Sequence, residues 1–204
     1  MPEGYQGAME DAWRALTDED LEMQARNAGS SFDQGVITIK LLDHRCVVDA
    51  GPRTVVIDGR DADPGEALLV LHYLANAAGI EPSGRLVSYR QLPGGNVYYQ
   101  AFRDRVTDVI GTAFDRDPQA VIDALNGLGA VRGRQDDISF IVPVFPKLPV
   151  TIVLWRGDDE VKGAASVLFD DTAPRFLHVE DLAAVGTLVA DHVASPKSAV
   201  SSGR

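Results

Sequence analysis

The spacing of hydrophobic residues predicts strands first and then a buried helix in the N-terminal half of the chain. Three runs with β-branched residues and a period of two, at 36–42, 45–49 and 54–58, are separated by short turn-forming sequences. The turns leave no room for crossover helices, so the runs predict a three-stranded antiparallel meander. Residues 64–78 are apolar on nearly every side, which predicts a central buried helix. Its start is marked by Asp63-Pro64-Gly65-Glu66, a sequence typical of a capped helix.

The remaining pattern predicts an α+β architecture. Helical spacing covers 8–26, 98–114, a segment opened by Asp117-Pro118, and 179–193, and strand patterns cover 138–145, 150–155 and 165–169. In 8–26, Thr17 with Asp20 three residues later suggests a second helix start. We therefore expect a single α+β domain in which a largely antiparallel sheet, made from both sets of strands, packs against the buried 64–78 helix and flanking helices. The predicted organisation is an N-terminal helical segment (1–30), this domain (31–194) and a disordered tail (195–204).

Composition and charge restrict the class of protein. The chain has 204 residues, is 45% hydrophobic and carries a net charge of −11, which is typical of a globular protein and disfavours nucleic acid and anionic lipid as partners. No apolar stretch approaches the ~20 residues of a membrane helix, and the start lacks the basic and apolar regions of a secretory signal. The single cysteine, Cys46, cannot form an internal disulfide and is too little for an iron–sulfur or zinc–thiolate site. We expect a cytoplasmic protein.

Five segments, in this order, resemble a known family. They are Leu69-Val70-Leu71-His72-Tyr73-Leu74, Val87-Ser88-Tyr89-Arg90-Gln91-Leu92-Pro93-Gly94-Gly95, Tyr98-Tyr99-Gln100-Ala101-Phe102, Val153-Leu154-Trp155-Arg156-Gly157-Asp158 and Leu168-Phe169-Asp170. Over about residues 35–193 the chain is similar to the domain of unknown function 3786 family of bacteria and archaea. The resemblance implies no particular activity. Some members are joined to iron–sulfur domains of corrinoid proteins, and this chain departs from them because it has one cysteine.

A basic segment stands out in this acidic chain. Residues 85–105 contain four Arg and one Asp, a charge of +3 that leaves −14 for the rest, together with three of the five tyrosines and a Pro-Gly-Gly turn. Arginine forks, aromatic rings and bare backbone are the groups that bind a carboxylate- or phosphate-bearing ligand. The candidate ligand-binding residues are Tyr89, Arg90, Gly94, Gly95, Tyr98, Tyr99 and Arg103. The alternative is that the glycines only form a turn and the arginines pair with surface acids.

Other residues offer candidate chemistry, each with a simpler structural interpretation. His72, on the buried helix, and Tyr98 are candidate catalytic groups for proton transfer, although a hydrogen-bonded core histidine is the commoner case. Cys46 with His44 suggests a nucleophile and its base, and a buried structural thiol is the favoured alternative. The acidic turns at 158–160 and 170–171 fit a hard cation or, more commonly, solvated loops. No histidine spacing predicts a metal site.

Three functions are consistent with these observations. The favoured one is an accessory protein that binds an anionic small molecule or a cofactor that the sequence does not identify. The second is an enzyme that orients an anionic substrate with arginine and uses His72 or a tyrosine for acid–base chemistry. The third is a structural subunit that binds a protein partner, or a second copy of itself, through its N-terminal helices.

Overall fold

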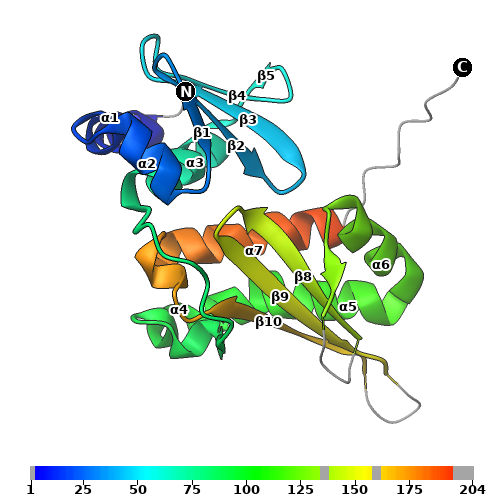
Figure 1. The fold of residues 1–204 in the computed structure, drawn as a ribbon. Helices are drawn as coiled ribbons and strands as arrows, with labels where there is room; N and C mark the ends of the chain where they lie inside the picture. The colour runs from blue at the N-terminus through cyan, green and yellow to red at the C-terminus, as the bar shows by residue number, and fades with distance from the viewer. Residues whose placement is uncertain (1–2, 134–137, 158–161, 195–204) are drawn as a thin grey trace, which may run out of the picture. The chain divides into compact units, whose positions relative to one another are not determined.

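The computed structural model describes residues 3–133, 138–157 and 162–194 (Figure 1). The chain divides into two compact units, each assembled from separate segments. The first unit holds the chain up to Arg85 together with Pro143–Pro149 and Asp170–Leu182, and the second holds Leu86–Val142, Val150–Phe169 and the chain from Ala183. The predicted tail, 195–204, lies outside the described residues. The boundaries predicted at residues 30 and 194 remain predictions.

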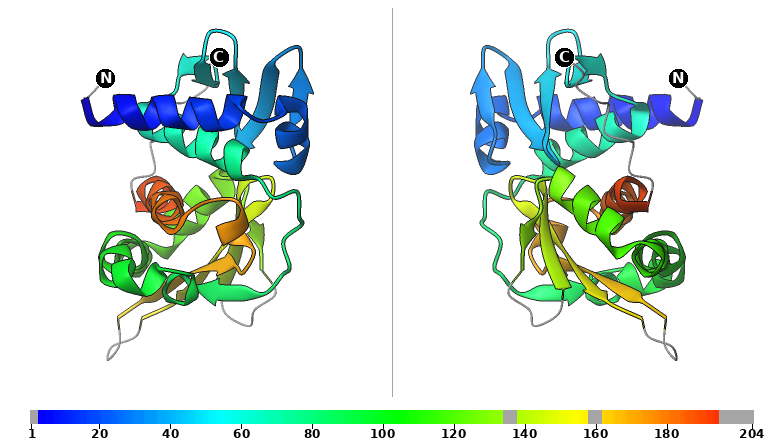
Figure 2. Two further views of the ribbon diagram at one scale, coloured as in Figure 1. Left: turned by 90° about the vertical axis from the view of Figure 1, so that its left-hand side faces the viewer. Right: turned by 90° about the vertical axis from the view of Figure 1, so that its right-hand side faces the viewer.

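In the first unit, two helices precede the strands and a third follows them. They are α1 (Glu3–Thr17), α2 (Leu21–Asn27) and α3 (Pro64–Asn76), and α1 and α3 lie side by side (Figure 2). The second helix start suggested at Thr17 is wrong, because the Asp20 carboxylate caps α2 by accepting the N–H groups of Glu22 and Met23. At α3 the predicted capping box is present, with Asp63 and Glu66 bonded to each other's backbone N–H groups.

The predicted meander is present and is extended at both edges. The strands β1 (Ser31–Asp33), β2 (Val36–Leu41), β3 (His44–Asp49), β4 (Thr54–Ile57) and β5 (Arg60–Asp61) form one sheet in sequential order, with every neighbouring pair antiparallel. Pairing aligns Ile37 with Val48 and Val48 with Val55, and all three are buried. Because side chains alternate along a strand, this register gives the sheet one apolar face.

A stacked aromatic cluster lies in the core of the first unit. The Tyr73 ring on α3 stacks on Phe145 with 4.1 Å between ring centroids, and on Phe176 at 5.7 Å. Phe145 comes from the 143–149 segment, which also accepts the N–H of Leu42 at the carbonyl of Val144. Phe176 follows a 3₁₀ turn, η3 (Ala173–Arg175). Residues far apart in the sequence thus complete one core.

The C-terminal strands form a second sheet, so the expectation that both sets of strands share one sheet is wrong. The strands β6 (Leu86–Ser88), β7 (Val131–Arg132), β8 (Ile138–Phe145), β9 (Leu148–Trp155) and β10 (Ala164–Asp170) are arranged in the order β6-β10-β9-β8-β7. In the described residues, β1 and β5 are the edge strands of the first sheet, and no strand of the second sheet pairs with either of them. Helices and antiparallel pairing in both sheets confirm the predicted α+β class.

Helices cover one face of the second sheet (Figure 2). They include α4 (Gly95–Phe102), the π-helical turn η2 (Arg103–Thr107), α5 (Asp108–Arg116), α6 (Pro118–Gly127) and α7 (Val179–Ala194). A Cβ on Gly111 of α5 would lie 3.2 Å from the backbone nitrogen of Ala165 on β10, so glycine permits this close helix–strand contact. In the described residues, no helix is both long and apolar enough to span a membrane.

Candidate functional site

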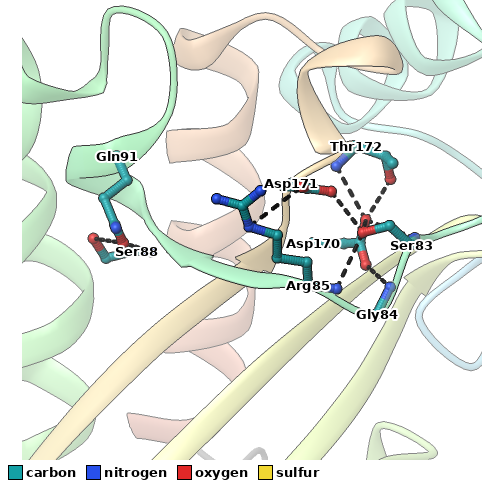
Figure 3. Close-up of polar contacts among 8 residues, drawn as sticks. All are labelled: Ser83, Gly84, Arg85, Ser88, Gln91, Asp170, Asp171 and Thr172. Atoms are coloured by element: carbon teal, nitrogen blue, oxygen red, sulfur yellow. Dashed lines mark hydrogen bonds and ion pairs between the residues drawn. The ribbon is translucent and has the colours of Figure 1, made fainter.

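The basic segment predicted as a ligand site folds into a 3₁₀ turn followed by a helix. The turn, η1 (Tyr89–Gln91), is capped by Ser88, whose N–H and hydroxyl both donate to the Gln91 side-chain oxygen (Figure 3). Gly94 precedes α4 with a φ of +78°, a left-handed conformation that favours glycine. The Pro-Gly-Gly sequence therefore reverses the chain and places η1 beside the start of α4.

Two of the predicted ligand-binding residues form part of the core beneath this turn. The Tyr89 side chain is 1% exposed, and its ring is stacked on that of Phe102 with 4.1 Å between centroids and 1° between planes. The N–H of Gly95 donates to the carbonyl of Leu92, and a Cβ on Gly95 would lie 1.9 Å from the Tyr89 carbonyl oxygen. The Tyr89 ring and the Gly95 N–H thus already have partners within the protein, and they stabilise the turn.

Arg90 is held at the surface by uncharged groups. Its Nε donates a 3.0 Å hydrogen bond to the side-chain oxygen of Asn96, and its Cζ lies 5.7 Å from the ring centroid of Tyr99. Within the described ranges, no carboxylate forms an ion pair with this guanidinium. The cation–π contact with Tyr99 and the hydrogen bond to Asn96 orient the group, and neither contact uses its terminal nitrogens.

Arg103 lies along the same side of the helix. Residues three, four and seven apart share one face of a helix, so Asn96, Tyr99 and Arg103 lie in a row. We call Arg90, Asn96, Tyr99 and Arg103 the α4 flank. Arg90, Tyr99 and Arg103 were predicted as site residues, whereas Asn96 was missed. Its position, two residues after Gly94 and in the first turn of the helix, could have indicated that it lies beside Arg90.

The charge of Arg103 is balanced within the helix. Its Nε lies 3.3 Å from the Asp108 carboxylate and 3.8 Å from that of Asp104. The π turn explains the first contact, because its wider winding hydrogen-bonds the Asp108 N–H to the Arg103 carbonyl and brings residues five apart together. Arg103 therefore pairs with surface acids, which was the alternative to ligand binding in the sequence analysis. In the described residues, Arg90 forms no such pair.

The other residues of the basic segment have separate positions. Tyr98 is 47% exposed and lies about 100° around α4 from Tyr99, so the two rings do not face the same way. Arg85 belongs to the first unit, where its Nε lies 3.7 Å from the Asp171 carboxylate. Arg85 and Arg103 thus pair with different aspartates, whereas Arg90 lies over Tyr99.

His72, the predicted proton-transfer residue, forms a pair with Asp181 in the first unit. Its Nδ1 lies 3.0 Å from each carboxylate oxygen of Asp181, and the two side chains are 29% and 17% exposed. His72 comes from α3 and Asp181 from the first turn of α7. A carboxylate that holds one ring nitrogen orients an imidazole for acid–base chemistry at the other. No local pattern identifies Asp181 as the partner, because it lies 109 residues from His72 in the sequence.

The Asp170 carboxylate, at the end of β10, lies at the centre of a cluster of hydrogen-bond donors (Figure 3). It is buried, and its oxygens accept hydrogen bonds from the N–H and hydroxyl groups of Ser83 and Thr172 and from the N–H of Gly84. Burial alone would raise the pKa of Asp170, but these hydrogen bonds outweigh it and lower the pKa. The protein itself satisfies this carboxylate.

The cation interpretation of the acidic turns is not supported in the described part of the chain. The candidate site combined two acidic turns, and one of them, residues 158–160, lies outside the described residues. Among the residues that are described, no group of three His, Cys, Asp or Glu side chains is placed to hold a metal ion.

Cys46 is a buried thiol, as the favoured interpretation predicted, and its burial argues against the nucleophile alternative. Burial, followed by the charges of Glu66 and Asp58, raises the pKa of Cys46 to about 12. The thiolate that a nucleophile requires is therefore scarce at neutral pH. His44 instead holds the Asp58 carboxylate, at 2.6 Å from Nδ1, and this contact contributes most to lowering the pKa of Asp58.

Comparison with known proteins identifies a family. The model of a family described as "Domain of unknown function (DUF3786)" matches residues 20–192. No curated protein and no solved structure matches the chain. The match confirms the resemblance seen in the sequence, and its description names no ligand or reaction.

Proposed function

The chain belongs to the DUF3786 family, a domain of unknown function, and from its own residues we propose that it is an accessory protein that binds an anionic small molecule on the α4 flank. The observation that carries the proposal is the Arg90 guanidinium, which Asn96 and Tyr99 orient and which pairs with no carboxylate of the described residues. We place this function in the cytoplasm, as the single buried thiol suggests. The proposal includes no nucleic acid and no membrane.

Arg90 differs from those arginines of the described residues that pair with carboxylates. In the described residues, Arg53 pairs with Glu10, Arg60 pairs with Glu66 through two hydrogen bonds, and Arg103 faces two aspartates. A protein with 30 acidic residues has carboxylates available for Arg90 as well. A guanidinium fixed by a neutral amide and a ring keeps its full charge for an external anion.

Ligand binding tests this proposal. Thermal shift and calorimetry with a panel of anionic metabolites should show stabilisation of the wild-type protein, because a ligand that binds the folded state raises its stability. Arg90→Ala should weaken the affinity about tenfold or more, the typical worth of a charge-assisted hydrogen bond. Arg105→Ala, which removes an equal charge from the same exposed segment, is the matched control. A wild-type protein that responds to no anion, or equal losses in the two variants, contradicts the proposal.

The His72–Asp181 pair favours a second candidate function, an enzyme acting on an anionic substrate. The pair provides an oriented imidazole that is partly open to solvent. In a screen of carboxylic and phosphoric esters, His72→Gln should abolish turnover without changing ligand affinity if this function is correct. Asp181→Asn should then shift the pH dependence of turnover, because Asp181 is a positioning residue. A wild-type protein without turnover in the screen contradicts this candidate. Tyr98 remains an untested candidate for the same chemistry.

A further inference from the structure

We propose that the anionic group recognised on the α4 flank is a carboxylate with one negative charge, and not a phosphate. This inference rests on the proposed function and specifies its ligand. It follows from the edge of the Arg90 guanidinium that remains open and from the charges along the flank.

The hydrogen bond to Asn96 decides which edge of Arg90 is open. A guanidinium can bind two oxygens side-on, through Nε and one terminal nitrogen, or end-on, through both terminal nitrogens. The Nε hydrogen of Arg90 is donated to Asn96, so the side-on edge is occupied. The end-on edge remains, and it presents two parallel N–H groups to two oxygens of an incoming group.

The ring of Tyr99 restricts the plane in which this edge lies. The guanidinium carbon stands over the ring, and this contact, with the hydrogen bond to Asn96, leaves the side chain little freedom to rotate. A planar carboxylate in the guanidinium plane forms both hydrogen bonds without reorienting the arginine. The oriented fork therefore fits a carboxylate, and because a phosphate also presents two oxygens to such a fork, the choice between the two groups rests on charge.

The charge along the flank favours a monoanion. Arg90 supplies one positive charge that no described carboxylate neutralises, whereas Arg103 is opposed by Asp104 and Asp108. A phosphate monoester carries about −1.5 to −2 at neutral pH. Among the described residues of the flank, its second charge would meet no second unpaired cation. A carboxylate matches the single available charge.

Paired ligands test this inference on the full-length protein. Benzoate and phenyl phosphate share a ring and differ in the anionic group, hexanoate and hexyl phosphate repeat the comparison with an aliphatic body, and benzamide is the uncharged control. Titration is followed by calorimetry and by the NMR signal of the Arg90 Nε–H. In each pair we expect the carboxylate to bind at least tenfold more tightly than the phosphate, and benzamide to bind more weakly than benzoate.

Two variants separate geometry from charge. Arg90→Lys keeps the charge and loses the fork, so the affinity for carboxylates should fall about tenfold and approach that for phosphates. Asn96→Ala leaves the charge and removes the orienting amide, so carboxylate affinity should fall several-fold. Circular dichroism confirms that both variants remain folded. Arg105→Ala should leave all affinities unchanged.

The outcomes distinguish this inference from the proposed function. Tighter binding of phosphates than of carboxylates, with both lost in Arg90→Ala, overturns the carboxylate assignment and leaves the proposed function in place. Equal affinity of Arg90→Lys and the wild-type protein for benzoate also overturns the assignment. If no anion in the pairs or in the wider metabolite panel binds the wild-type protein, the proposed function and this inference both fail.

Discussion

The hydroxyl of Tyr73 donates a 3.0 Å hydrogen bond to the backbone carbonyl of Ala28, at the end of α2. The same oxygen accepts the N–H of Lys147, at 3.1 Å, from the 143–149 segment. One buried hydroxyl thus satisfies two backbone groups from segments more than a hundred residues apart. Burial, the main influence, raises the pKa of Tyr73, so the hydroxyl stays protonated and able to donate at neutral pH.

Tyr73→Phe should destabilise the protein while preserving its aromatic stack. The ring would still pack on Phe145, but two buried backbone groups would lose their partner, at a cost of about 1–3 kcal/mol in the free energy of unfolding. Urea denaturation measures this difference. Tyr98→Phe, which removes an exposed hydroxyl, is the control and should change stability by less than about 0.5 kcal/mol. Equal stability of Tyr73→Phe and the wild-type protein would contradict the structural role.

Asp170→Asn should destabilise the protein in a pH-dependent way. The lowered pKa of Asp170 means that the folded state favours the ionised carboxylate, so its contribution is present above the unfolded pKa of about 3.9 and is lost as the pH falls through the folded-state value. At pH 7 the variant should lose about 3 kcal/mol or more, because an amide cannot accept all the hydrogen bonds. Denaturation between pH 7 and pH 3 should show the wild-type advantage shrinking with acid.

The exposed Asp61 provides the control for this pH series. Asp61→Asn should follow the wild-type curve within about 0.5 kcal/mol at every pH. A loss in Asp170→Asn that is the same at pH 7 and pH 3 would argue against ionisation as the source of the stabilisation.

Gly95→Ala should be strongly destabilising even though alanine favours helices. The added Cβ would lie 1.9 Å from the Tyr89 carbonyl oxygen, so η1 and the start of α4 would have to separate, at a cost of about 1–3 kcal/mol. Gly127→Ala in α6 is the matched control, since its Cβ would meet nothing within 4 Å. The control should be neutral or stabilising by up to about 1 kcal/mol. Similar melting temperatures for the two variants would contradict the close contact.

Cys46 should resist thiol reagents in the native protein. With a pKa of about 12 and full burial, its thiolate fraction at pH 8 is on the order of one in ten thousand. Labelling with Ellman's reagent at pH 8 should therefore be at least a hundredfold slower in the native protein than in urea. Equal rates in both conditions would show that the thiol is accessible.

Local signals in the sequence were sufficient to locate the main elements. The cap at Asp63 and Pro64 located α3, and the period-two runs located β2, β3 and β4, because caps, turns and alternation depend on neighbouring residues. The short edge strands β1 and β5 have no such pattern, since their pairing depends on the strands beside them. The division into two sheets depends likewise on which strands pair, and this is not written in the local pattern.

The candidate site was predicted in part. Arg90 and Tyr99 were grouped correctly because they lie close in the chain, whereas the burial of Tyr89 depends on its stacking against Phe102, which composition does not reveal. The π turn at Arg103–Thr107 also escaped prediction, because a single wide turn leaves the helical spacing of apolar residues almost unchanged. Asp181, the partner of His72, depends on tertiary structure alone.

The first unit takes segments from three parts of the chain, and this constrains how the protein matures during translation. When Arg85 leaves the ribosome, the N–H of Leu42 and the ring of Tyr73 still lack Val144, Phe145 and Phe176. An N-terminal fragment ending at Arg85 would therefore expose an incomplete apolar core to water. The newly made segment up to Arg85 must wait until the chain has been synthesised beyond Phe176 before it can reach its final packing.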